Sequence, residues 1–310
     1  MKNTSLVIGS RGSDLALWQA NHIRDILVTE YDCDVQIQII RTAGDRLDQL
    51  SFEKMEGKGF FTKELEEALL SSQVDLAVHS LKDLMTTQPD GLMLGAVGFR
   101  ADRRDMLLAR PEVFTGEGLL PIQNGSVVGT SSARRKCQIA AADQSLVIKD
   151  LRGNVPTRVQ KLRDGDYDAI VIAAAGIHRL RIELSDMKRI PLDPELFLPA
   201  PAQGVLGLQI RSDDARTKRF VAQLGSEKIS VEVLLERGLL AKFDAGCSLP
   251  LGVFSRIEGK QMYLSAILGT GNPGAWSGLR KFNAEGDDVA SLVTQVYEQL
   301  TRSGEPCVSE

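Results

Sequence analysis

The sequence contains few of the residues that mark secreted, membrane-spanning or metal-binding proteins. Its 310 residues include four cysteines without a C-x-x-C pair and three histidines that stand far apart. Neither a disulfide framework nor a zinc site is indicated. No run of eighteen apolar residues occurs, and the N-terminal MKNTSLVIGS lacks the zones of a signal peptide. We therefore expect a cytoplasmic protein that holds no metal.

Aromatic residues are also scarce, and acidic residues outnumber basic ones. Aromatics make up 5% of the chain and the net charge is −4. Few aromatics leave no stacking platform for single-stranded nucleic acid, and the negative surface repels DNA and acidic membranes. No Walker pattern occurs, and no G-x-G-x-x-G pattern directly joins a predicted strand to a predicted helix, which disfavours nucleotides. We expect a small-molecule ligand, no nucleic acid or membrane partner, no obligate protein partner, and a monomer.

Short apolar runs alternate with helical patterns in the first part of the chain. LVIG (6–9) is a buried-strand run, followed by a turn and a helical pattern over 14–31. DVQIQIIR (34–41) alternates like a strand, and a helix from Phe61 leads into the strand VDLAVHS from Val74. Strands that alternate with helices predict an α/β protein with parallel sheets.

A weak internal repeat predicts two domains of similar build. VIGSRGSDLA near residue 7 resembles VVGTSSARRK from Val127, and VDLAVHS resembles YDAIVIAA from Tyr167. The chain is expected to cross between the domains at 99–104 and to return through FLPAPAQG (197–204). A third, α+β domain is predicted from helices over 230–243 and 287–302 with two strands between them. The predicted domains are 1–99 plus 200–222, 100–199 and 223–310.

Cationic side chains follow several predicted strands, where the chain turns into a helix. Free N–H groups and the dipole at a helix N-terminus attract anions, and an arginine there makes a carboxylate or phosphate clamp. The alternative is N-capping by Ser13, Asp14 or Ser132 with the arginines facing water. Loops after parallel strands meet at one edge, so these cations predict a cleft for a ligand with several carboxylates. The cations are Arg11, Lys82, Arg134, Arg135, Arg152 and Arg158.

Two further side chains suggest chemistry, and a long polar segment suggests a lid. Asp83 is an acid beside Lys82; it either caps a helix or pairs with Lys82, or it steadies positive charge or moves a proton on a ligand. Cys247, in the loop sequence FDAGCSLPLG, is either a reachable thiol or a half-buried small hydrophobe. The segment 42–60 is longer than an ordinary connection and is either a disordered excursion or a lid carrying Lys54 and Lys58.

Seven sequence blocks in consistent order resemble the porphobilinogen deaminase (hydroxymethylbilane synthase) family over essentially the whole chain. The blocks are GSRGSxLA (9–16), EGKGFFTKELE (56–66), VDLAVHSLKD (74–83), GTSSARRKCQ (129–138), LRGNVPTR (151–158), PAPAQG (199–204) and AGCSLPLG (245–252). The resemblance implies an α/β fold in which two similar periplasmic-binding-protein-like domains with mainly parallel sheets flank a cleft, plus a smaller α+β third domain that carries the cysteine loop.

The resemblance also implies a reaction and its residues. A dipyrromethane cofactor would be attached to Cys247 through a thioether, and four porphobilinogen molecules would be deaminated and joined on it, with hydrolysis releasing 1-hydroxymethylbilane. Asp83 would be the catalytic carboxylate, and Lys54, Lys58 and Phe61 would belong to a mobile loop. Cofactor-binding residues would be Ser80, Lys82, Thr130, Ser132, Arg134, Arg135 and Arg158, and substrate-binding residues Arg11, Ser13, Arg152 and Gln203.

The chain departs from the family pattern at two places. Leu84 and Met85 follow Asp83 where many relatives have Val-Pro, and Gln209 stands where an acidic residue is common. Two rival interpretations use the same residues. A twin-domain solute receptor explains the arginines but requires neither Cys247 nor Asp83, and a cysteine-nucleophile enzyme lacks a base near Cys247.

Overall fold

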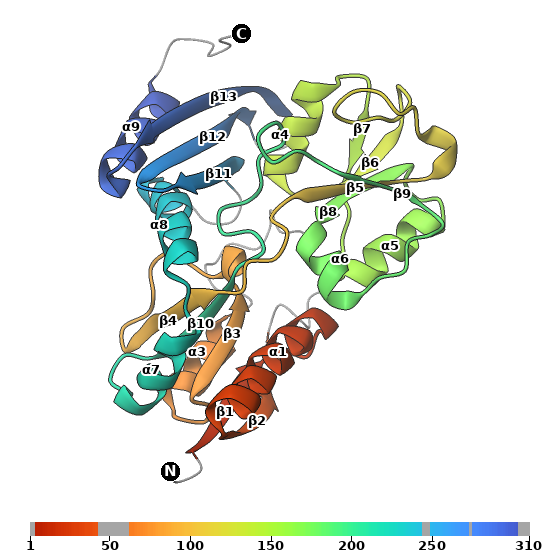
Figure 1. Cartoon of the computed structure of the whole chain (residues 1–310). Coiled ribbons are helices and arrows are strands. Elements are labelled where there is room, and N and C mark those ends of the chain that lie inside the picture. Colours follow the sequence, from red (N-terminus) through yellow and green to blue (C-terminus); the bar gives the residue numbers. More distant parts are fainter. Residues whose placement is uncertain (1–3, 43–61, 244–248, 273–274, 303–310) are drawn as a thin grey trace. The chain divides into compact units, whose positions relative to one another are not determined.

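The computed structural model describes residues 4–42, 62–243, 249–272 and 275–302 (Figure 1). Its contacts divide the chain into two compact units. Unit 1 holds the residues up to Ala101 and Gly204–Ser230, and unit 2 holds Asp102–Gln203 and the residues from Val231. The changes of unit at 101–102 and 203–204 coincide with the predicted crossings. The division into three domains with the predicted boundaries stays a prediction.

Unit 1 is a five-stranded sheet with helices on both faces (Figure 1). The strand order is β2-β1-β3-β10-β4; β1 runs parallel to β2 and β3, while β10 is antiparallel to β3 and β4. Residues of α1 and α7 pack on one face and those of α3 on the other. The elements are β1 (Thr4–Ser10), α1 (Asp14–Tyr31), β2 (Cys33–Ile39), α3 (Lys63–Leu70), β3 (Leu76–Ser80), η2 (Leu81–Asp83), β4 (Leu92–Gly98), β10 (Leu206–Arg211), α7 (Ala215–Val221) and η4 (Ala222–Leu224).

Alternation along the strands builds the two cores of unit 1. Leu6 and Ile8 of β1 are fully buried against Ile23 of α1. Gly9 points to the other face, where an added Cβ would lie 3.0 Å from a Val74 methyl group and 3.1 Å from a methyl group of Leu65 in α3. The strand can approach α3 closely because this position has no side chain.

The sheet of unit 2 has the order β7-β6-β8-β5-β9. β6 is parallel to β7 and β8, and β5 is antiparallel to β8 and β9. Residues of α5 and α6 pack on one face and Ile139 of α4 on the other. The elements are β5 (Asp105–Ala109), η3 (Pro111–Val113), β6 (Val127–Gly129), α4 (Ala133–Ala142), β7 (Val147–Lys149), α5 (Val155–Arg163), β8 (Ala169–Ala173), α6 (Ala174–Leu180) and β9 (Lys188–Pro191).

The internal repeat predicted from the sequence is confirmed by a shared hydrogen-bonding device. In unit 1 the Asp75 carboxylate accepts a bond from the backbone N–H of Val7 at 2.9 Å. In unit 2 the Asp168 carboxylate accepts the same bond from Val127 at 2.8 Å. Each aspartate precedes the central strand of its sheet, and the two strand orders correspond. The two sheets are therefore structural twins, as expected for the predicted fold class.

Both sheets are mixed, which differs from an all-parallel arrangement. The fourth strand of each sheet, β5 or β10, directly follows a change of unit. It enters at the edge where the parallel strands end: Leu206 pairs with Ser80, and Asp105 pairs with Ala173. A strand that enters at that edge has to run in the opposite direction.

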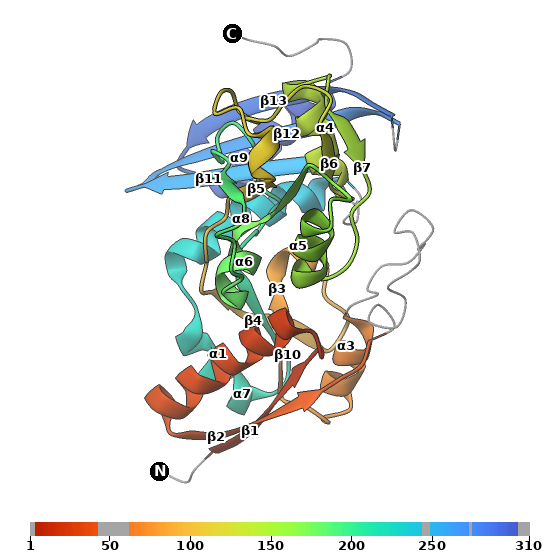
Figure 2. The same ribbon diagram turned by 90° about the vertical axis from the view of Figure 1, so that its right-hand side faces the viewer.

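A third sheet, in unit 2, is an antiparallel meander of three strands covered by helices (Figures 1 and 2). Leu235 of α8 and Val296 of α9 are fully buried in its core. The sequence analysis predicted two strands here, and the structure adds β13, which was missed although Lys281, Asn283 and Glu285 alternate with Phe282 and Ala284. The elements are α8 (Glu227–Lys242), β11 (Leu251–Glu258), β12 (Gln261–Asn272), β13 (Ala275–Gly286) and α9 (Val289–Thr301).

Candidate active site

In unit 1 the predicted residues lie at the carboxyl ends of β1 and β3. These parallel strands pair at Ile8–Leu76 and Gly9–Ala77, so their ends share one edge of the sheet. Arg11 follows β1 and is half-buried. Ser13 is the N-cap of α1, and its hydroxyl accepts a bond from the Ala16 N–H at 3.4 Å. The capping alternative therefore holds for Ser13, and because the hydroxyl accepts in this bond, its O–H can still donate to a ligand carboxylate.

Ser80, Lys82 and Asp83 occupy the end of β3 and the short 3₁₀ turn that follows it. The Ser80 hydroxyl accepts a 2.7 Å bond from the amide nitrogen of Gln19, which is buried on α1. Lys82 is half-buried, and the Asp83 side chain is exposed. The backbone of this turn is fixed by a bond from the Leu81 N–H to the Val205 carbonyl. Unit 1 thus presents an accessible carboxylate on a well-held turn at the same edge as Arg11.

In unit 2 the corresponding edge carries the strand-to-helix turns after β6, β7 and β8. Thr130 is buried, and its hydroxyl accepts a bond from the Ser132 N–H at 3.3 Å. Ser132 is the N-cap of α4, with no side-chain capping bond. Arg152 and Arg158 are half-buried, and the Nε of Arg158 donates to the Gly153 carbonyl at 2.7 Å. The edge therefore offers hydroxyl and guanidinium groups together.

The capping alternative predicted that Arg134 and Arg135 face water. The structure shows that both are buried. Both are about 95% buried, at 4% and 5% exposed, and they share one carboxylate. Nη1 of Arg134 and Nη2 of Arg135 each lie 2.7 Å from an oxygen of Asp105. Asp105 begins β5 and is fully buried. This pairing was not predictable from local sequence patterns, because Asp105 lies far upstream of α4 in the chain.

The cluster formed by Asp105, Arg134 and Arg135, called the Asp105 cluster, holds more positive than negative charge. Burial alone would raise the pKa of Asp105, but the two guanidinium groups more than offset burial and hold this pKa well below its usual range. Two guanidinium groups against one carboxylate leave one positive charge in excess. The Nε of Arg135 is buried without a hydrogen-bond partner among the described residues. The cluster therefore fits a nearby anionic group.

Gln203, predicted to bind substrate, is also part of this cluster. It is 1% exposed, and its amide nitrogen donates to the Asp105 carboxylate and to the Arg103 carbonyl, both at 2.9 Å. Both amide protons are thus used inside unit 2. The contact with substrate stays a prediction, while the internal role is a finding.

Sequence reasoning missed Arg179, in α6. This residue is 7% exposed, and burial lowers its pKa to about 10. It lies six residues beyond the end of β8, in the last turn of α6. The rule applied to the other cations, a basic residue where a strand turns into a helix, does not select Arg179, because α6 begins at Ala174 and Arg179 is near its end.

Four predicted residues lie outside the described residues. They are the loop residues Lys54, Lys58 and Phe61 and the predicted attachment residue Cys247. Of the cysteines in the described segments, Cys33 and Cys137 are both buried, and burial raises the pKa of Cys137 to about 12. These two thiols are therefore poor nucleophiles.

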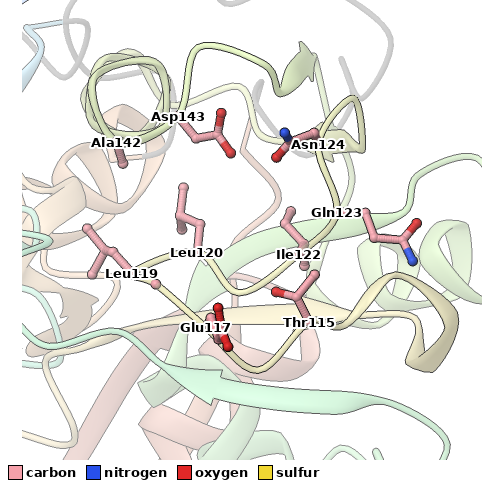
Figure 3. Close-up of a pocket in the computed structure, with 10 residues that line it drawn as sticks. Thr115, Glu117, Leu119, Leu120, Ile122, Gln123, Asn124, Ala142 and Asp143 are labelled. Atoms are coloured by element: carbon pink, nitrogen blue, oxygen red, sulfur yellow. The ribbon is translucent and has the colours of Figure 1, made fainter.

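A cavity of about 300 Å³ in unit 2 does not coincide with the predicted residues (Figure 3). Its lining comes from residues 115–124 together with Ala142 and Asp143, and the charged side chains in it are the acids Glu117 and Asp143. Such a lining does not suit a ligand with several carboxylates. In the described segments we also find no cluster of three metal-binding side chains and no helix long and apolar enough to cross a membrane.

Burial of His79 predicts a pH-dependent stability. Burial lowers the pKa of His79 to about 4, although its bond to Gln209 opposes this shift. The unfolded chain, with a histidine pKa of about 6.5, binds the proton first as the pH falls, so this contribution is complete above about pH 6.5 and is lost toward pH 4. The free energy of unfolding should fall by about 3 kcal/mol over this interval through His79 alone.

Urea unfolding at several pH values measures this loss. His79→Gln should flatten the slope between pH 6.5 and 4, while His178→Gln, at an exposed position, should keep it. Equal slopes in the two variants would contradict the assignment.

The fold and the two edges define a class of protein before any comparison is made. Each of the twin α/β units carries hydroxyl and cationic side chains after its parallel strands, and unit 1 also carries the exposed carboxylate of Asp83 at that edge. These groups are the ones expected in an enzyme that acts on a small ligand bearing several carboxylates.

The chain belongs to the porphobilinogen deaminase family. Residues 6–219 match the family described as "Porphobilinogen deaminase, dipyromethane cofactor binding domain", and residues 230–300 match "Porphobilinogen deaminase, C-terminal domain". The porphobilinogen deaminase of Sulfurimonas denitrificans is 44% identical over 270 residues, which cover 86% of this chain and 84% of the relative. That of Roseiflexus sp. strain RS-1 is 39% identical over 307 residues, covering 98% of both chains.

Among solved structures, an ancestral arginine-binding protein bound to arginine aligns with a TM-score of 0.40 at 13% identity. The alignment covers 72% of this chain and 92% of that protein.

Proposed function

We propose that this chain carries out the reaction of its family: it is a transferase of tetrapyrrole and haem biosynthesis. It deaminates four porphobilinogen molecules, joins them head to tail on a covalently bound dipyrromethane cofactor, and releases 1-hydroxymethylbilane by hydrolysis. Membership of the family and its dipyrromethane cofactor binding domain support this proposal. The cofactor, when bound, supplies the primer to which porphobilinogen units are added.

The assignment of Asp83 as the catalytic residue rests on its position. Its carboxylate is exposed on a held turn, at the sheet edge that also carries Arg11. As ammonia leaves the substrate, positive charge develops on the pyrrole, and an aligned carboxylate stabilises that charge. Pairing with pyrrole N–H groups is the contact through which Asp83 would act.

The cationic and hydroxyl groups suit the acetate and propionate side chains of cofactor and substrate. We assign cofactor binding to Ser80, Lys82, Thr130, Ser132, Arg134, Arg135 and Arg158, and substrate binding to Arg11, Ser13, Arg152 and Gln203. Arg134 and Arg135 would contribute mainly through the excess positive charge of their cluster, since both are nearly buried. Lys54, Lys58 and Phe61 would form a lid over bound pyrroles.

Cys247 is the proposed attachment residue of the cofactor. Intact-mass measurement of the purified protein should show an excess equal to two condensed, deaminated porphobilinogen units, and Cys247→Ser should lack it, because a serine hydroxyl forms no thioether. Cys307→Ser is the matched control and should keep the added mass. An active preparation with an unmodified mass would disprove the attachment.

We further propose that the protein works in the cytoplasm as a monomer on a small-molecule substrate, without nucleic acid, membrane or an obligate protein partner. The negative net charge and the scarcity of aromatic side chains support this proposal.

A further inference from the structure

Gln209 lies at the centre of a buried hydrogen-bond network in unit 1. It is fully buried on β10, and its side-chain oxygen lies 3.0 Å from Nε2 of His79. Its amide nitrogen lies 2.8 Å from the side-chain oxygen of Gln88 and 3.4 Å from a carboxylate oxygen of Glu66. One amide therefore accepts a hydrogen bond from β3 and donates to two other segments.

The network holds the chain on both sides of Asp83. His79 lies four residues before Asp83, at the end of β3, where it pairs with Gly207 of β10. Gln88 lies five residues after Asp83, and its own amide nitrogen donates to the Met85 carbonyl at 2.8 Å. Gln209 thus connects the strand that enters the Asp83 turn with the segment that leaves it.

Only an amide satisfies all of these contacts at once. A carboxylate at position 209 would accept from His79 but has no proton to give to Gln88, and it would face the Glu66 carboxylate. An apolar side chain would leave both His79 and Gln88 without this partner. The two departures noted in the sequence, Met85 and Gln209, are therefore joined through Gln88.

We propose that Gln209 is a positioning residue for Asp83, acting through His79 on one side of the turn and through Gln88 and Met85 on the other. The inference rests on the catalytic role proposed for Asp83. A turn held at both ends keeps the carboxylate in one orientation, and small displacements of a catalytic group are costly in rate.

The alternative is that these side chains merely satisfy one another in the core. A core pair of this kind contributes to stability alone, so its loss lowers the folded and loaded fraction of the protein. A positioning residue also changes the turnover of each loaded molecule. Turnover therefore has to be expressed per cofactor-loaded molecule, with loading measured by intact mass.

The experiment compares two single variants, their double variant and a matched control variant with wild type. Gln209→Met, which removes both connections, should lower kcat per loaded molecule roughly 10-fold with KM within about twofold, because Gln209 is fully buried and is not accessible to substrate. Gln88→Met removes one connection and should lower kcat roughly threefold. The double variant should be no slower than Gln209→Met, since both substitutions cut the same connection. Gln36→Met, at an exposed position of β2, is the matched control and should retain wild-type kcat.

Hydrogen exchange gives a second readout that does not depend on catalysis. The backbone amides of residues 80–88 should exchange faster in Gln209→Met than in wild type or Gln36→Met. If Gln209→Met does not fold, the kcat and hydrogen exchange of Gln88→Met test the inference instead. The Gln88 side chain is only half-buried, so its substitution should leave the fold intact.

A Gln209→Met enzyme with kcat per loaded molecule within twofold of wild type would overturn the inference, and so would a double variant whose losses multiply. The assignment of Asp83 is tested separately. It fails if Asp83→Asn keeps its turnover, regardless of the result for Gln209→Met.

Discussion

Asp83→Asn is expected to lower kcat at least about 100-fold while the cofactor stays attached. The substitution keeps the shape of the side chain and removes its negative charge. Asp83 is exposed at the end of β3, so no buried partner is lost and the fold should persist. What disappears is the charge that would offset the developing positive charge on the substrate.

Turnover per loaded molecule and intact mass, measured on the same preparation, test this expectation. Asp90→Asn is the control, because Asp90 is exposed a few residues downstream and has no assigned role. An Asp83→Asn enzyme that retains more than about a tenth of wild-type kcat would remove Asp83 from the mechanism. Loss of the added mass in Asp83→Asn would instead assign the residue to cofactor assembly.

Asp105→Asn is expected to lower the free energy of unfolding by about 3–5 kcal/mol. Asp105 is the shared partner of Arg134 and Arg135, and all three side chains are nearly or fully buried. Removing the carboxylate leaves two guanidinium groups in the interior without a counter-charge. The stability lost is much larger than for an exposed ion pair, because water cannot screen the remaining charges.

Urea unfolding of four proteins tests the cluster. Asp186→Asn breaks the surface pair with Arg163 and should cost no more than about 1 kcal/mol. Asp105→Asn combined with Arg135→Gln should recover part of the loss, because one buried cation is removed with the carboxylate. Equal effects of Asp105→Asn and Asp186→Asn would show that the cluster does not depend on its shared carboxylate.

The strands and turns that carry the site were predictable because their signals are local. The run LVIG is followed by a hydroxyl-rich turn and an amphipathic helix, and the structure has β1, the Ser13 cap and α1 there. The echo between 74–80 and 167–174 identified the twin central strands. Signals of this kind depend on residues within one turn or one strand of each other.

The burial of Arg134 and Arg135 could not be read from the sequence. Their partner lies on β5, which joins the sheet only after the chain has changed unit, and a helix N-terminus rich in arginine normally indicates an exposed anion site. The hydrogen-bond network around Gln209 could not be predicted from the sequence for the same reason, because 130 residues separate Gln209 from His79. Side chains that meet through long-range pairing leave no periodic pattern.

The place of β10 in the chain also sets an order for folding during protein synthesis. All five strands of the sheet in unit 2 lie within one stretch, Asp105–Pro191, whereas the sheet of unit 1 lacks its fourth strand until Leu206–Arg211 has been made. On the ribosome, the later-encoded sheet can close first, and the earlier one waits with β3 and β4 unjoined. A truncated chain released before Leu206 would expose both strand edges and be prone to aggregate.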